Sequence, residues 1–433
     1  MASTYLTRTI TTSTDNTKFT ISVWVKKLKQ VSSSYQNIVN SRQSGTTNGL
    51  GLWFGDNDEI FYNFGTSSTA SSACQTNAKY RDNSGWYHIV LAGDASQSGT
   101  DKLKFYVNGE QITSFQTDNR SSFTTIAYDI GDTTYPTIIG RKHDGTFQYD
   151  GLMSHFHFID GTAYQASTFG EYDANGVWKI KTSPSVTYGN NGFFILKDGN
   201  SVTDQSGNSN NFTVGGGTLT NTEDNPSNVF ATLNPLGGRN GSGKGTYSNG
   251  NTTWVSSTTD QDACNSTIAI DDGGKYYCEM KCVSKTGGYY NPGIFSAVQD
   301  SYNSANPSIF ARGDGVIYNN GSQTQSGLAS INDGDIIGMA YDGSGATHTF
   351  QLYKNGSAYG SAENITNTPG YPLFFGDGTN SGSVSNTVSF NFGNGYFGTT
   401  AVSSAGTNAS GNGIFEYDVP TGYTALSTKG LNL

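Results

Sequence analysis

The residues best suited to chemistry in this sequence are pairs of acids two positions apart. Glu171 and Asp173 have the spacing that places two carboxylates on one face of a strand. Retaining glycoside hydrolases need two carboxylates about 5–5.5 Å apart across the scissile bond, and a run Glu-x-Asp-x-Glu would supply them. The third acid of such a run is replaced by Asn175, and Glu416 with Asp418 also lacks it. We therefore expect a protein that is not an enzyme.

Two groups of aromatic residues in loops are candidates for sugar binding. Tyr149 follows His143 and Asp144, and Tyr289 with Tyr290 lies in the loop TGGYYNPG. A sugar site needs exposed rings that stack on a pyranose face, with a few polar groups that bind the hydroxyls. These five residues are the predicted carbohydrate-binding set, and half-buried loop packing is the alternative for each ring.

Metal binding is suggested at two places, each with a plainer alternative. Asp56 and Asp58 in the run DNDE offer clustered oxygens, which calcium prefers, although a hairpin turn also favours Asp and Asn. His155 and His157 share a strand face and could bind a metal if another strand supplied a third ligand. Packed or solvent-facing strand histidines are the alternative. We expect no cofactor, and calcium is the one possibility left open.

Charge and hydropathy exclude several classes of protein. The formal net charge is −10, whereas nucleic-acid binding depends on a basic surface that displaces counterions. No apolar run approaches the roughly 18 residues that a membrane span needs. The first residues, MASTYLTRTI, have neither the basic leader nor the apolar core of a signal peptide. We expect no nucleic-acid partner, no membrane insertion and synthesis in a cytoplasm without secretion by a signal peptide.

The composition indicates an all-β protein. The chain of 433 residues contains 56 glycines, 13 % aromatic residues and only 13 % charged residues. Strand and turn formers are enriched, and helix formers are scarce. LKFYV (103–107) alternates apolar and polar residues and precedes Asn108-Gly109, a pair typical of tight hairpin turns. The sequence therefore predicts many short strands joined by tight turns.

The same hairpin pattern occurs a second time. FQLYK (350–354) precedes Asn355-Gly356, and an apolar strand ending in Asp lies upstream of each copy, at 86–94 and at 335–342. A repeat of this length indicates two related domains in tandem. We expect two antiparallel β-sandwiches, at 1–215 and 251–433, joined by a Gly/Asn/Ser-rich connection at 216–250 that carries one or two short strands.

Particular phrases resemble known families. Trp86-Tyr87-His88, Phe105 to Gly109, Ile139-Gly140 and Tyr149 to Leu152 resemble, in order and spacing, laminin-G-like domains of the concanavalin A-like lectin/glucanase superfamily. The resemblance implies a jelly-roll sandwich of the concanavalin A type for the first domain.

The second domain is similar to SPRY domains, which are a variant of the same sandwich. The resemblance rests on KYYCE (275–279), DIIG (335–338), the strand before Asn355-Gly356, and FNFG (390–393). It implies that both domains share one architecture, which explains why the hairpin recurs.

The order of several phrases along the whole chain resembles virion proteins of marine tailed bacteriophages, especially those of cyanobacteria. The phrases are FHFIDG, STFGEYDANGVWK, DQSGNSNNFT, LNPL and PTGYTALSTKGLNL. The resemblance implies a structural and binding protein of the virion, in a tail fibre or appendage that contributes to adsorption. The implied partners are other virion proteins, in the tail or capsid, and a glycan or protein of the host cell surface.

Two alternatives to a tail fibre stay open. A capsid-attached fibre or decoration protein would fit a chain whose first sandwich begins almost at once, and a glycan hydrolase is disfavoured by the incomplete run of acids. A homo-oligomer such as a trimer would have to use sandwich faces, because no heptad pattern for a coiled-coil stalk is visible.

Overall fold

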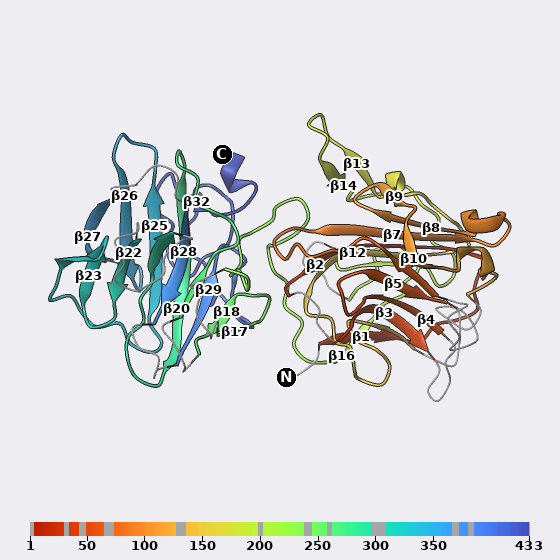
Figure 1. Cartoon of the computed structure of the whole chain (residues 1–433), viewed down its shortest axis with the longest axis horizontal. Coiled ribbons are helices and arrows are strands. Elements are labelled where there is room, and N and C mark those ends of the chain that lie inside the picture. Colours follow the sequence, from red (N-terminus) through yellow and green to blue (C-terminus); the bar gives the residue numbers. More distant parts are fainter. Residues whose placement is uncertain are drawn as a thin grey trace. The chain divides into compact units, whose positions relative to one another are not determined.

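The computed structural model describes most of the chain. The described residues are 4–29, 34–42, 49–64, 73–126, 136–197, 202–237, 245–257, 262–296, 308–365, 372–379 and 385–432. They form two compact units, 1–221 (unit 1) and 222–433 (unit 2), and each unit is built from antiparallel sheets (Figure 1). The prediction of two tandem antiparallel β-sandwiches is confirmed.

Helical structure in the described ranges is limited to short 3-10 turns. These are η2 (Gly99–Lys102), η3 (Arg120–Ser122), η4 (Ala166–Thr168) and η5 (Gly430–Asn432). None of the helices among the described residues has the length and apolar character needed to cross a membrane.

Unit 1 contains two large sheets and one small hairpin among its described residues. The larger sheet has the spatial order β10 (Phe115–Asp118), β6 (Ala73–Thr76), β5 (Ile60–Asn63), β4 (Gly49–Phe54), β3 (Gln36–Arg42), β11 (Thr137–Ile139), β1 (Tyr5–Arg8), β16 (Thr213–Gly216). The second sheet has the order β15 (Phe193–Ile195), β12 (Gly151–Asp160), β2 (Lys18–Lys27), β7 (Tyr87–Asp94), β8 (Leu103–Val107), β9 (Glu110–Ile112). The hairpin consists of β13 (Gly170–Tyr172) and β14 (Trp178–Ile180).

The core of unit 1 lies between the two large sheets. Alternate residues of a strand point to opposite faces, so Phe19, Ile21 and Val23 of β2 reach the interior together. They join one buried apolar cluster with residues of the other sheet, such as Leu50 and Leu52 of β4. This sandwich fixes the edges and loops on which any site of unit 1 must lie.

Unit 2 repeats the plan. Its larger sheet has the order β17 (Thr246–Ser248), β18 (Thr253–Val255), β29 (Asn386–Asn391), β20 (Lys275–Lys285), β25 (Ile336–Asp342), β26 (His348–Lys354), β27 (Ser357–Ile365), with β32 (Thr424–Ala425) parallel to β20. The second sheet has the order β19 (Ala263–Asn265), β28 (Leu373–Gly378), β21 (Gly293–Ser296), β22 (Ser308–Arg312), β23 (Val316–Asn319), β24 (Ser322–Gln325). A small pair is formed by β30 (Tyr396–Phe397) and β31 (Thr400–Ala401).

Most of the segment predicted as a connection belongs to unit 2 in the structure. The division between the units falls at 221/222. Phe230 and Leu233 are almost fully buried in the apolar clusters of unit 2. Because these side chains pack with strands far away in sequence, the run of Gly, Asn and Ser around them did not reveal that they belong to the sandwich.

The two Asn-Gly hairpin turns are confirmed. Asn108 and Gly109 have φ of 49° and 85°, and Asn355 and Gly356 have φ of 49° and 80°. Positive φ at both central positions is the requirement of a type I′ turn, which matches the twist of the flanking strands. The first turn joins β8 to β9 and the second joins β26 to β27.

The asparagine of each turn also binds the neighbouring strand in the same way. The side-chain Oδ1 of Asn108 accepts from the backbone N–H of His88 at 2.8 Å, and its own N–H donates to the His88 carbonyl at 2.9 Å. Asn355 makes both bonds with Ile336, each at 2.8 Å. The repeat therefore extends from sequence pattern to individual hydrogen bonds.

We expect Asn108→Ala and Asn355→Ala each to destabilise only their own unit, by about 1–3 kcal/mol. Each change leaves one largely buried backbone N–H without its acceptor and places alanine at positive φ. Calorimetry of the intact chain would resolve the two unfolding transitions. Asn57→Ala, in an exposed turn, is the control. Both variants lowering the same transition would contradict two independent sandwiches.

Candidate functional site

The outer face of the second sheet of unit 1 is covered by its own chain. Residues from 161 to 190 pack there, with Ala166 and Phe169 against Val90, Tyr106 and Ile159 in one apolar cluster. The side chains of Val90, Tyr106 and Ile159 on this face are therefore buried and cannot contact a ligand.

His88 is packed under this cover and is not available as a ligand. Its ring stacks on Trp24 at 4.6 Å between ring centroids. Its Nδ1 accepts from Nε1–H of Trp178 at 3.0 Å, so the ring proton lies on Nε2, which contacts the Ser22 hydroxyl at 2.8 Å. Burial lowers the pKa of His88 to about 3. The ring is a neutral structural group.

The predicted histidine pair is divided by a bulge. The register of β12 against β2 shifts between Ser154 and His157, and His155 has φ of 48°. The buried His157 contacts the Tyr188 hydroxyl through Nδ1 at 2.9 Å, and its ring stacks on Phe194 at 3.9 Å. No group of three metal-ligating side chains occurs among the residues described. The alternative of packed histidines accounts for both positions.

Asp58, one of the two predicted calcium ligands, is not available to a metal cation. Asp58 is nearly fully buried, and its carboxylate binds the Lys27 ammonium and, at 3.3 Å, Nε of Arg81. Burial lowers the pKa of Lys27, and the hydrogen bond from Lys27 to Asp58 offsets part of this shift. Asp58 is thus the acid of a buried ion pair, which the turn-like run DNDE did not reveal. Only Asp56 stays exposed enough to meet a cation.

The first predicted sugar site is used for internal bonds. Tyr149 packs against the core, its hydroxyl donates to the Lys26 carbonyl at 3.1 Å, and burial raises its pKa. The Nδ1 of His143 lies 3.3 Å from Oδ1 of Asn40. Asp144 accepts from its own loop, and hydrogen bonds from Lys142 and Thr146 outweigh burial and lower its pKa. The three residues lie on one loop, but Tyr149 does not present a free ring.

The second predicted sugar site is corrected at one residue. Tyr290 is fully buried in the core of unit 2, and its hydroxyl donates to Asp333 at 2.7 Å. A ring without exposed surface cannot stack on a sugar. Tyr289 is half-buried, with the Arg312 guanidinium 5.6 Å from its ring centroid. Sequence alone could not separate these neighbours, because either could have turned inward.

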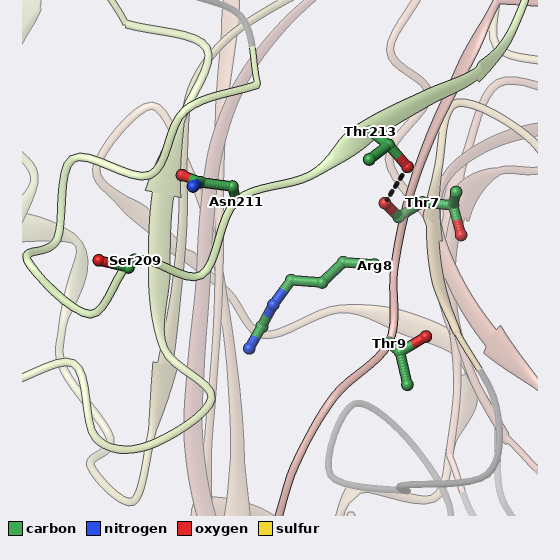
Figure 2. Close-up of a pocket in the computed structure, with 6 residues that line it drawn as sticks. All are labelled: Thr7, Arg8, Thr9, Ser209, Asn211 and Thr213. Carbon is green, nitrogen blue, oxygen red and sulfur yellow. Dashed lines mark hydrogen bonds between the residues drawn. The ribbon is translucent and has the colours of Figure 1, made fainter.

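A polar hollow on unit 1 was not predicted. It has a volume of about 340 Å³ and is lined by Thr7, Arg8, Thr9, Ser209, Asn211 and Thr213. Figure 2 shows Arg8 extending from β1 toward the loop that carries Ser209 and Asn211. Thr213 begins β16, beside β1, and its hydroxyl donates to the Thr7 carbonyl at 3.2 Å. The hollow therefore lies where a sheet edge meets a loop.

The loop beside the hollow is ordered by Asp204. Its carboxylate accepts from the backbone N–H groups of Phe194, Ser206 and Asn210 at 2.8–2.9 Å. Its own N–H donates to Oδ1 of Asn211 at 2.8 Å. The run DQSGNSNNF was the available signal, because Asp, Asn and Ser hydrogen-bond to nearby backbone in turns.

Arg8 anchors this loop to the sheet. It is 9 % exposed, with Nη1 donating to the Asn191 carbonyl at 3.2 Å and Nη2 donating to the Asn210 side chain. Burial lowers the pKa of Arg8, and the charge of Asp204 partly restores it. An arginine stays protonated even so, and a cationic floor is thus built into the hollow.

The acids that suggested hydrolysis do not form a catalytic pair. Glu171 is exposed and pairs with Lys181 at 3.3 Å. Asp173 follows the end of β13, accepts from the N–H groups of Asn175 and Val177, and lies 3.8 Å from Nζ of Lys179. Both acids lie on a hairpin with their own lysine partners rather than across a groove.

The sequence was also compared with known proteins. Residues 2–167 match the family model of the concanavalin A-like lectin/glucanases superfamily, of laminin G type. The matched residues lie within unit 1. The match confirms the resemblance to laminin-G-like domains, and its description includes both lectins and glucanases. No curated protein sequence matches the chain.

Several solved structures are similar to parts of the chain. The SPRY domain of human HERC1 is 19 % identical and covers 36 % of this chain and 96 % of that domain, with a TM-score of 0.30. A heptameric SAP-like pentraxin from Limulus polyphemus is 12 % identical and covers 37 % of this chain and 71 % of its own, with a TM-score of 0.28. A candidate carbohydrate binding protein from Bacteroides ovatus is 18 % identical, covers 50 % and 59 %, and has a TM-score of 0.31.

Proposed function

We propose that the chain is a non-enzymatic glycan-binding and structural protein of a bacteriophage virion, in a tail fibre or appendage that contributes to host adsorption. The observation that carries the binding role is the match of residues 2–167 to a superfamily of lectins and glucanases. Within that description, lectin-like binding is favoured over hydrolysis, because Glu171 and Asp173 are paired with lysines on an exposed hairpin. The place in a virion is supported by the order of phrases along the sequence.

Binding by such a protein would depend on copy number. Shallow polar sites at loops and sheet edges give weak individual contacts, and display of many copies on one particle raises the effective affinity. Each chain needs only to hold its loops in a fixed geometry. The hydrogen bonds of Asp204 and of the Asn-Gly turns provide that rigidity.

We expect the purified chain to compete with intact phage for the host surface. Adding it in excess to host cells should lower the rate of phage adsorption, since both occupy the same surface glycans. The chain unfolded by heat is the control. Unchanged adsorption at saturating concentrations of the folded chain would count against a role in host contact.

Immunogold labelling of virions would separate the tail from the capsid. Gold on the tail or its fibres supports the proposed appendage. Gold around the head alone would replace it with the capsid-attached alternative, and no gold on the particle would contradict a virion protein altogether.

A further inference from the structure

We infer that the hollow at Arg8 binds the carboxylate of an acidic sugar, such as a uronic acid. The inference deepens the proposed function, on which it rests, by naming a site and a ligand class. It starts from the donors of the arginine. The guanidinium has five N–H donors in a rigid fork that fits a carboxylate. In the described part of the chain its acceptors are the Asn191 carbonyl and the Asn210 side chain, bound by Nη1 and Nη2.

Arg8 forms no ion pair with a carboxylate among the described residues. No carboxylate there lies within ion-pair distance of it, and none of the residues that line the hollow is acidic. Asp204, which acts on Arg8 electrostatically, already accepts from three backbone N–H groups and from the Ser206 hydroxyl at 2.7 Å. A buried cation without a close counter-charge favours an incoming anion, because the attraction is weakly screened there.

The size and lining of the hollow suit a sugar better than a bare anion. Its volume of about 340 Å³ falls within the range of roughly 300–1,000 Å³ typical of small-molecule sites. Thr9, Ser209, Asn211 and Thr213 are exposed, so the hollow opens to solvent. The carboxylate of the sugar would accept hydrogen bonds from the Arg8 guanidinium, and the hydroxyls of the sugar ring would contact these exposed polar residues.

The test is a titration of the intact chain by nuclear magnetic resonance with methyl β-D-glucuronide, with methyl β-D-glucoside as the neutral match. We expect the glucuronide to bind at least about tenfold more tightly. Asn211→Asp should weaken the glucuronide about tenfold, because it adds a negative charge to the lining while its oxygen still accepts from the Asp204 N–H. Gln205→Glu adds the same charge to the exposed side of the loop, outside the lining, and should change the affinity less than about twofold.

Three results would overturn the inference. The two glycosides could bind equally, the two variants could weaken binding equally, or inorganic sulfate could bind as tightly as the glucuronide, which would make the hollow a simple anion site. A binding test with neutral glycans distinguishes failure of this inference from failure of the proposed function. If the chain binds neutral glycans but not the glucuronide, only the inference fails; if it binds no glycan at all, both fail.

Discussion

Replacing Glu279 with alanine is expected to destabilise unit 2 by about 3 kcal/mol. The buried carboxylate accepts from the backbone N–H groups of Glu416 and Tyr417 at 2.8 and 2.9 Å, and from the Tyr277 hydroxyl at 3.2 Å. These bonds hold the segment around Phe415, which packs on the outer face of the larger sheet. Alanine leaves the donors without an acceptor, and each unsatisfied buried donor costs about 1–3 kcal/mol.

Chemical denaturation of the intact chain would measure this loss, with the unit 1 transition as the internal reference. Glu279→Gln is the matched control, since it keeps one carbonyl oxygen as an acceptor, and we expect it to lose about half as much stability as the alanine variant. An alanine variant whose unit 2 unfolds with the wild-type free energy would show that the C-terminal segment is not held by this carboxylate.

The stabilities of the two units are expected to respond oppositely to pH between about 7.5 and 5. In unit 1, burial lowers the pKa of His88 to about 3 and the pKa of His157 well below its usual value. In unit 2, burial raises the pKa of Glu279 and of Asp377 to about 7, despite the backbone hydrogen bonds that each accepts.

The sign follows from which state binds more protons. Below about 6.5, unfolded unit 1 takes up protons on histidines that stay neutral when folded, so acid destabilises unit 1. Between about 4 and 7, folded unit 2 keeps protons on acids that ionise on unfolding, so unit 2 loses stability as pH rises through this window. Each fully shifted group contributes a slope of up to about 1.4 kcal/mol per pH unit.

Calorimetry from pH 7.5 to 5 would follow both transitions in one sample. We expect the unit 1 midpoint to fall and the unit 2 midpoint to rise on acidification. Glu279→Gln and Asp377→Asn should flatten the pH dependence of unit 2 and leave that of unit 1 unchanged. Parallel shifts of both transitions would contradict the assignment of the buried groups.

The parts of the fold predicted from sequence are those that depend on local conformation. Asn108-Gly109 and Asn355-Gly356 specify positive φ by their own side chains, so the turns could be placed without any knowledge of packing. The alternation of apolar residues on β2 likewise depends on the strand alone.

The parts that were missed depend on contacts between distant segments. Trp178 lies so close over Gly109 that an added Cβ would meet its ring at 2.5 Å, and Tyr417 covers Gly356 in the same way at 2.6 Å. No local pattern indicates that these two rings cover equivalent turns. The inward turn of Tyr290 and the buried pair of Lys27 with Asp58 are of the same kind.

The candidate site also combines a part that depends on local sequence with a part that depends on contacts between distant segments. The loop of Asp204 has a recognisable turn composition, but its role in the hollow needs Arg8, nearly 200 residues earlier in the chain. β1 and β16 bring these segments together as neighbours in one sheet. A pattern search along the sequence could not find a site whose parts are joined only by strand pairing.

The proposed function is that this chain binds glycans without cleaving them. Its most direct test is a glycan array probed with the intact chain, followed by mass analysis of the bound glycans after incubation. We predict reversible binding to a subset of surface glycans, each recovered at its original mass. Shortened glycans, or an array without any signal, would contradict the account.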